Sequence, residues 1–278
     1  MKGENSVQLR TNDFKFKDKK LSDFGFIVVN TSNSTNTRIV GLNRSLGTVD
    51  GIGGNRIISK INSNEVSFEI FISKLDEKGM PSSITENDIT KLTTWLFSPT
   101  NYEQLVALDE NTNIVYYGMF TNAEQTYLNK NNEGYIKLTF ELNGNCAYER
   151  LKEFKCNASS NSSPNGVLII NYTGNIDEYY YPDIEFSVTS DSFTIINKTL
   201  GEKMQLFGLN ADSKKGIIYG EGIMCVVSSV NPQENMRAKI NKDSGYRTTF
   251  RLKQGINEIE IQGTGSFNFK IQPKISLR

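Results

Sequence analysis

The chain has 278 residues, with 31 lysines and arginines against 31 aspartates and glutamates, so its formal net charge is zero. This balance argues against a nucleic acid or an anionic membrane as the main partner. Histidine is absent, which excludes Ser-His-Asp and Cys-His nucleophiles and histidine-ligated metals. We find no apolar run of membrane-spanning length and no signal-peptide core at the amino terminus.

The first part of the chain has the periodicity of strands. Residues 14–20 alternate phenylalanine and lysine, which is typical of a half-buried strand with a locally basic edge. Further strands are expected at residues 24–30, 37–43 and 66–72. Residues 41–54 are glycine-rich but match neither a P-loop nor a dinucleotide-binding fingerprint. We expect a long irregular loop there, for which a mobile loop and an interface loop are equally good interpretations.

One helix is expected, at Glu86–Phe97. Thr85 is its N-cap, and Asp88 completes a capping box. Pro99 disfavours helical geometry in the residue before it and ends the helix. The apolar side chains share one face, with the only tryptophan, Trp95, at its edge: Ile89, Leu92 and Leu96. Such a helix among strands should pack on a sheet, with Trp95 in the core.

After the helix, strands are expected at residues 104–109, 114–128 and 134–142, with a hairpin turn rich in Asn and Gly at 128–134. Asp109, Asn111 and Asn113 resemble the start of a calcium-binding loop. Ile114 and Phe120 then stand where that loop needs Gly and Glu, so a hairpin turn is the better interpretation.

The composition changes at residues 155–166 to small polar residues with one proline, which predicts a linker. The expected domains are therefore residues 1–154 and 167–278. Strand signals at regular spacing in the second half are typical of a β-sandwich. These expected strands are residues 167–172, 184–188, 192–197, 204–209, 217–219, 223–230, 246–252, 257–262 and 267–271.

No cofactor and no metal site is expected. The cysteines are odd in number, lack CxxC spacing and are interpreted as small apolar fillers: Cys146, Cys156 and Cys225. A glycosidase would need two paired acids, but nothing in the sequence pairs the candidates, which we interpret as solvated surface groups: Asp177, Glu178 and Glu221.

Consecutive tyrosines precede Pro182, at Tyr179, Tyr180 and Tyr181. Tyr179 and Tyr180 are candidates for stacking against a sugar. Consecutive strand residues point to opposite faces, however, so all three cannot form one platform, and a structural role is favoured.

The order of these features resembles the siphophage distal tail protein family, often called Dit. In the first half the resemblance rests on Phe14 and Phe16, Asp23 and Gly25, the loop 41–51, the strand 66–72, Trp95-Leu96, residues 104–109, Tyr116-Tyr117-Gly118 and Cys146-Ala147-Tyr148. In the second half it rests on Phe250, Leu252, Gly255, Asn257, Ile259 and Gly263, which resemble the closing hairpin of the family's galectin-like domain.

The resemblance implies a mainly β fold, with an N-terminal β-sandwich or split-barrel-like domain that carries one α-helix and a C-terminal galectin-like β-sandwich. It implies a non-enzymatic hexameric ring at the tail tip that joins the tail tube to the hub or baseplate, with DNA passing through the lumen. The implied partners are other copies of the chain, the tail tube protein, the tail-associated hub or lysin protein and receptor-binding proteins. Neither specific nucleic-acid binding nor membrane insertion is implied, and the protein would be made in the host cytoplasm and reside in the virion.

Ring closure is heterologous, so each subunit needs two different complementary surfaces. The first candidate is the glycine-rich loop: Gly41, Asn43, Arg44, Gly47, Asp50 and Gly51. The second is the hairpin at residues 114–128: Tyr116, Tyr117, Phe120 and Tyr127.

Two other functions stay open at this point. The C-terminal sandwich and its tyrosines also fit a carbohydrate-binding module protein that adheres to cell-wall glycans, and a carboxylate glycosidase needs no histidine.

Overall fold

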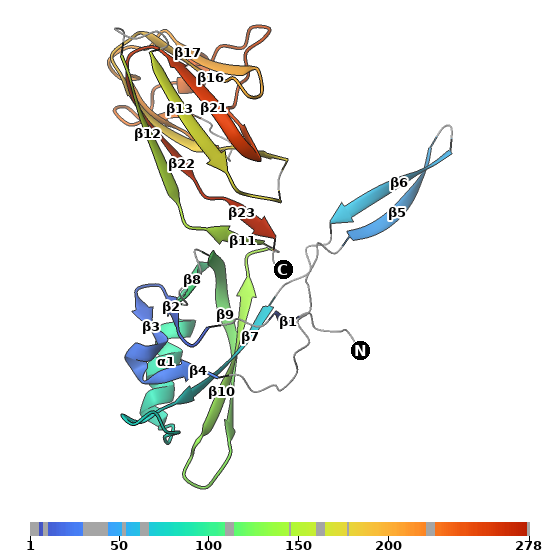
Figure 1. The fold of residues 1–278 in the computed structure, drawn as a ribbon, viewed down its shortest axis with the longest axis vertical. Coiled ribbons are helices and arrows are strands. Elements are labelled where there is room, and N and C mark those ends of the chain that lie inside the picture. Colours follow the sequence, from blue (N-terminus) through green and yellow to red (C-terminus); the bar gives the residue numbers. More distant parts are fainter. Residues whose placement is uncertain are drawn as a thin grey trace. The chain divides into compact units, whose positions relative to one another are not determined.

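The computed structural model describes residues 6–7, 11–29, 44–51, 54–61, 67–108, 114–144, 146–159, 165–176, 178–220 and 226–276. The chain divides into two compact units, of which the first is Met1–Tyr148 with Ile275–Arg278 and the second is Glu149–Lys274. Figure 1 shows the strands of both units and the α-helix of the first unit. The division falls before the expected linker at residues 155–166, and the chain end belongs to the first unit.

A ten-stranded branched sheet builds the first unit, in the order β1-β7-β10-β9-β8-β2-β3, with β4 paired to β7 and β11 paired to β9 and β23. Its strands are β1 (Ser6–Val7), β2 (Phe14–Phe16), β3 (Lys19–Lys20), β4 (Phe26–Val28), β7 (Ser67–Lys74), β8 (Glu103–Ala107), β9 (Ile114–Tyr127), β10 (Gly134–Leu142), β11 (Cys146–Glu149) and β23 (Lys274–Ser276). The mainly β class with one α-helix is confirmed.

Alternation of apolar and polar residues explains which face of this sheet is buried. Along β7, Phe68, Ile70 and Ile72 are buried while their neighbours are half-exposed. β10 shows the same period of two and pairs with β7 in an antiparallel register that sets Leu138 opposite Ile70.

The helix α1 (Glu86–Phe97) lies on this sheet (Figure 1). Its capping box forms as expected: the Thr85 hydroxyl accepts from the Asp88 amide at 3.3 Å, and Asp88 accepts from the Thr85 amide at 2.9 Å. Trp95 is 6 % exposed and donates its indole N–H to the Phe16 carbonyl at 3.1 Å. The expectation of a core tryptophan is therefore confirmed.

The segment expected as a strand at residues 24–30 is shorter than predicted. A 3₁₀ helix, η1 (Leu21–Phe24), comes first, and Gly25 ends it with a φ of 75°, a value that glycine adopts without strain. Only Phe26–Val28 then pair with β7. The strand expected at residues 37–43 lies outside the described residues.

The glycine-rich segment forms a hairpin where we expected an irregular loop. β5 (Arg44–Gly51) pairs with β6 (Gly54–Ile61) over the full length of both strands, from Arg44 opposite Ile61 to Gly51 opposite Gly54. The two strands form a sheet of their own. Gly51 and Gly54 thus form the last pair of a β-ribbon, while Gly47 lies within β5 opposite Ile58.

Two sheets build the second unit as a β-sandwich. One has the order β12-β22-β15-β18-β19 and the other β13-β21-β16-β17. Their strands are β12 (Lys152–Ala158), β13 (Gly166–Tyr172), β15 (Asp183–Val188), β16 (Ser192–Asn197), β17 (Glu202–Phe207), β18 (Lys215–Ile218), β19 (Val226–Ser228), β21 (Gly255–Gln262) and β22 (Gly265–Ile271). The rings of Phe186 and Phe193 meet between the sheets at 5.0 Å. A galectin-like topology stays a prediction.

Two expectations for the second unit are corrected. Lys155 and Cys156, assigned to the linker, belong to β12 and pair with β22. Residues 246–252 were expected to form a strand, but most of them are irregular. Only Leu252 lies in a strand, β20 (Leu252–Lys253), which pairs with β14 (Tyr179–Tyr180). A second 3₁₀ helix, η2 (Met236–Lys239), precedes this stretch.

Candidate functional site

The β9–β10 hairpin holds the aromatic candidates, and the structure separates them by depth. Phe120 is 5 % exposed and packs on Phe16 and Phe140, so it is a core residue and the prediction of an interface role is wrong. Tyr116 is half-buried against Phe68, and this burial raises the pKa of its phenol. Tyr117 lies on the opposite face, where its hydroxyl accepts from the Gln104 amide at 2.7 Å.

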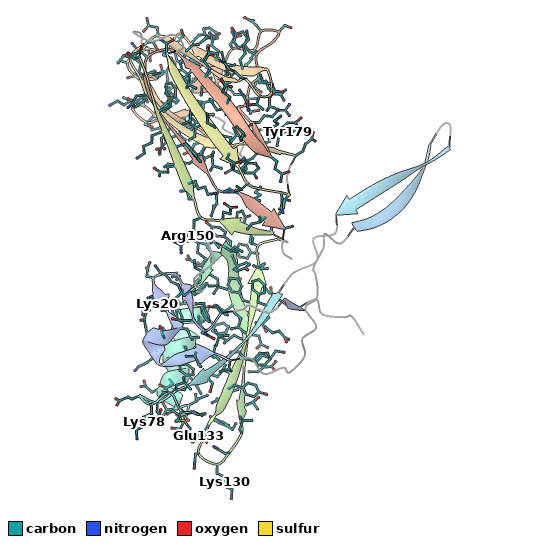
Figure 2. The ribbon with its side chains drawn as sticks, viewed as in Figure 1. Lys20, Lys78, Lys130, Glu133, Arg150 and Tyr179 are labelled. Carbon is teal, nitrogen blue, oxygen red and sulfur yellow. The ribbon has the colours of Figure 1, made fainter. Side chains whose placement is uncertain are left out.

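The distal end of this hairpin is its exposed part. Tyr127 is 49 % exposed and Leu128, which the sequence analysis did not single out, is 71 % exposed. Asn129 fixes the turn, because its side-chain carbonyl accepts from the amides of Asn131 and Glu133 at 3.0 and 3.2 Å. Figure 2 shows Lys130 and Glu133 at this tip. The hairpin therefore presents an apolar pair on a rigid, polar turn.

The glycine-rich candidates fall on the β5–β6 ribbon. Arg44, Gly47, Asp50 and Gly51 lie in β5. Gly41 and Asn43 lie outside the described residues. No third strand pairs with this ribbon among the described residues, and a two-stranded ribbon by itself is only marginally stable in water.

The paired tyrosines of the second unit point in different directions. Tyr180 stacks on Tyr172 with centroids 4.8 Å apart, and its hydroxyl accepts from the Gln272 amide at 2.9 Å. Tyr179 has the Arg251 guanidinium 3.6 Å from its ring centroid and lies at the edge of the unit in Figure 2. The two rings do not form one sugar platform, in agreement with the structural role favoured above.

An ion cluster holds Arg251 in this position. Glu202 accepts from the Nε and Nη2 atoms of Arg251 at 2.8 and 2.6 Å and from Nη1 of Arg247 at 3.0 Å. The hydrogen bonds from Arg251 hold the pKa of Glu202 below its ordinary value and raise that of Arg251. These contacts tie the irregular segment before β20 to the start of β17.

We expect Glu202→Gln to destabilise the second unit by about 1–2 kcal/mol at neutral pH, because it removes charge-assisted hydrogen bonds from a mostly buried group. A lowered pKa in the folded state gives stability that is present above the unfolded-state pKa of about 4.3 and is lost as the pH falls through the folded-state value. The difference in the free energy of unfolding between wild type and variant should thus become smaller in acid. Urea unfolding at a series of pH values measures it, and a difference that does not depend on pH would contradict this role.

Of the other chemical candidates, the structure describes only some. Glu178 is exposed, while Asp177, Glu221 and Cys225 lie outside the described residues. Burial raises the pKa of the Cys156 thiol, as for an inert filler. Within the part of the chain that the structure describes, no three His, Cys, Asp or Glu residues are grouped to hold a metal. No helix there has the length and apolarity to cross a membrane.

Comparisons with known proteins agree with these observations. Residues 9–144 match the family described as "Phage tail protein N-terminal domain". The solved structure of the Dit protein of phage SPP1 is 15 % identical, with a TM-score of 0.58, and the match covers 94 % of this chain and 98 % of that one. None of the curated proteins compared matches.

Two structures of the phage P2 baseplate, in its activated conformation with calcium and with strontium, are each 13 % identical, with TM-scores of 0.48 and 0.46. The matches cover 94 % and 93 % of this chain and 97 % of each of those chains.

Proposed function

We propose that this chain, which carries a phage tail protein N-terminal domain at residues 9–144 and has the fold of a Dit protein, forms a closed homomeric ring at a phage tail tip. The ring would join the tail tube to the hub or baseplate in the virion and let DNA pass through its lumen. Six copies are expected from the family resemblance. The role is structural, and the partners are the tail tube protein, the hub protein and receptor-binding proteins.

The β5–β6 ribbon is the observation that carries this proposal. It has eight residues in each strand and pairs with no third strand among the described residues. A ribbon of this length gains stability when it packs on or pairs with another chain. We therefore assign it to one side of the contact between neighbouring copies.

A ring needs a second, different surface on each copy. The distal β9–β10 hairpin provides exposed apolar side chains in Tyr127 and Leu128. It is the candidate for the other side of the contact, because adjacent exposed apolar side chains would leave water when another copy covers them.

Oligomer formation by the full chain tests the proposal. Mass photometry and negative-stain imaging across a wide concentration range, with and without the tail tube and hub proteins, should show closed rings. Ile58→Pro, which removes a donor that faces Gly47 across the β5–β6 ladder, should give monomers, and so should the double variant Tyr127→Ala, Leu128→Ala. Lys78→Ala, in an exposed turn of the same unit, is the matched control and should assemble normally. Only monomers from the wild-type chain under every condition would contradict the proposal.

Carbohydrate binding by the second unit is the alternative. Tyr179 is the candidate contact, since its ring is held by Arg251 at the edge of the sandwich. A glycan array with the full chain and with Tyr179→Ala separates the two functions, because ring formation does not depend on this residue.

A further inference from the structure

A groove of about 520 Å³ lies on the first unit, between the β2–β3 turn and α1. Residues from two distant parts of the sequence line it: Lys17, Asp18, Lys19 and Phe24 on one side, and Thr90, Lys91, Thr94, Trp95 and Ser98 on the other. Sequence analysis did not predict it, because the two segments are brought together only by the packing of α1 on the sheet.

The floor of the groove is aromatic and rigid. Phe24 and Trp95 stack with centroids 4.6 Å apart and an interplanar angle of 17°. Trp95 also stacks on Phe14 and is fixed by its hydrogen bond to the Phe16 carbonyl. A preformed apolar floor favours a flat or bulky apolar side chain, since little conformational entropy is lost on binding.

The rim of the groove is cationic. Lys17 has a carboxylate of Glu103 at 3.6 Å. Lys19 and Lys91 have no ion-pair partner within the described ranges, and the Lys19 ammonium lies 5.7 Å from the Phe24 ring centroid. Asp18 is the one acidic side chain in the lining, so the rim has an excess of positive charge in a chain of zero net charge.

The turn that carries these lysines holds an unfavourable backbone conformation. Lys17 has a φ of 54°, in the left-handed region that glycine or asparagine adopts at lower cost. A non-glycine residue kept there is strained, and such residues cluster at functional sites. The conformation sets Lys17 at the edge of the groove, beside Asp18 and Lys19.

We propose that this groove is the docking site for an acidic segment of a partner protein. A bulky apolar side chain of that segment packs on Phe24 and Trp95, and its flanking carboxylates lie beside Lys19 and Lys91. The positive charge of the rim favours carboxylates, and the aromatic floor favours a bulky apolar side chain. Docking does not require ring closure, so it stands apart from the proposed function.

Trp95 is the reporter for the test, because it is the only tryptophan in the chain. The full-length protein is titrated with a short synthetic peptide that has a central Phe flanked by Glu, and tryptophan fluorescence is followed. We expect a saturable change that weakens with added salt. The comparison probes are the same peptide with Ala in place of Phe, its Lys-flanked counterpart, inorganic phosphate and a single-stranded oligonucleotide.

Two charge reversals identify the site. Lys19→Glu and Lys91→Glu are exposed substitutions that should leave folding intact, and each should weaken peptide binding about tenfold. Lys78→Glu, in an exposed turn outside the groove lining, is the matched control and should bind as the wild type does.

Four results would overturn the proposal: no saturable binding of the Phe–Glu peptide, equal binding of the Ala peptide or the Lys-flanked peptide, equal binding of phosphate or the oligonucleotide, or equal loss in the Lys78→Glu control. Ring assembly is measured separately by mass photometry, so a negative result here leaves the test of the proposed function unaffected.

Discussion

Replacing Trp95 with alanine is expected to destabilise the first unit by about 3–5 kcal/mol. The substitution removes an indole that is 6 % exposed and stacks on Phe14 at 6.0 Å and on Phe24 at 4.6 Å. It also leaves the Phe16 carbonyl without its indole donor. The cavity would lie between α1 and the sheet, so the packing of the helix on the sheet would weaken.

Hydrogen exchange, read by mass spectrometry, measures this effect unit by unit. Protection should fall in β2, β9 and α1 and stay unchanged in β13 and β21, which belong to the other unit. Trp95→Phe is the control: it keeps an aromatic ring but loses the N–H donor, and its cost should be clearly smaller. A loss below about 1 kcal/mol for Trp95→Ala would show that the helix is held by other contacts.

Asn257→Ala should cost about 3 kcal/mol in the second unit. Asn257 is fully buried, and its side chain donates to the carbonyls of Lys253 and Gly255 at 2.8 and 3.0 Å. Its carbonyl oxygen accepts from the Lys253 amide at 3.0 Å and from the Asn197 amide group at 3.1 Å. Alanine would remove all four hydrogen bonds, including the one to the buried Asn197, at the turn where Gly255 has a φ of 89°.

Urea unfolding followed by circular dichroism, together with hydrogen exchange of β20 and β21, measures the loss. Asn171→Ala is the matched control, because Asn171 is exposed on β13 and should change stability by no more than about 0.5 kcal/mol. Equal effects of the two substitutions would mean that the buried network contributes little to the fold.

Local sequence signals predicted the elements that depend on local chemistry. The bounds of α1 follow from Thr85, Asp88 and Pro99, and the structure places the helix at Glu86–Phe97 as expected. The strands β10 and β16 also have the predicted bounds, because their alternation and flanking turns define them without help from distant residues.

Long-range contacts account for what the sequence could not predict. Residues 155–158 were predicted as linker because small polar residues follow them. They belong to β12, and this assignment depends on pairing with β22, which is more than a hundred residues away in the sequence. In the same way the β5–β6 ribbon is defined by cross-strand pairing, which glycine content does not reveal. The groove between the β2–β3 turn and α1 also could not be predicted, because it forms only when α1 packs on the sheet.

Locating the protein in the phage particle tests the central claim most directly. Gold-labelled antibodies against the full chain should bind purified virions at the tail tip, and a cryo-electron microscopy map of that tip should contain a closed ring of this fold. Label along the tail tube or on the capsid, or virions that lack the protein, would contradict a tail-tip ring.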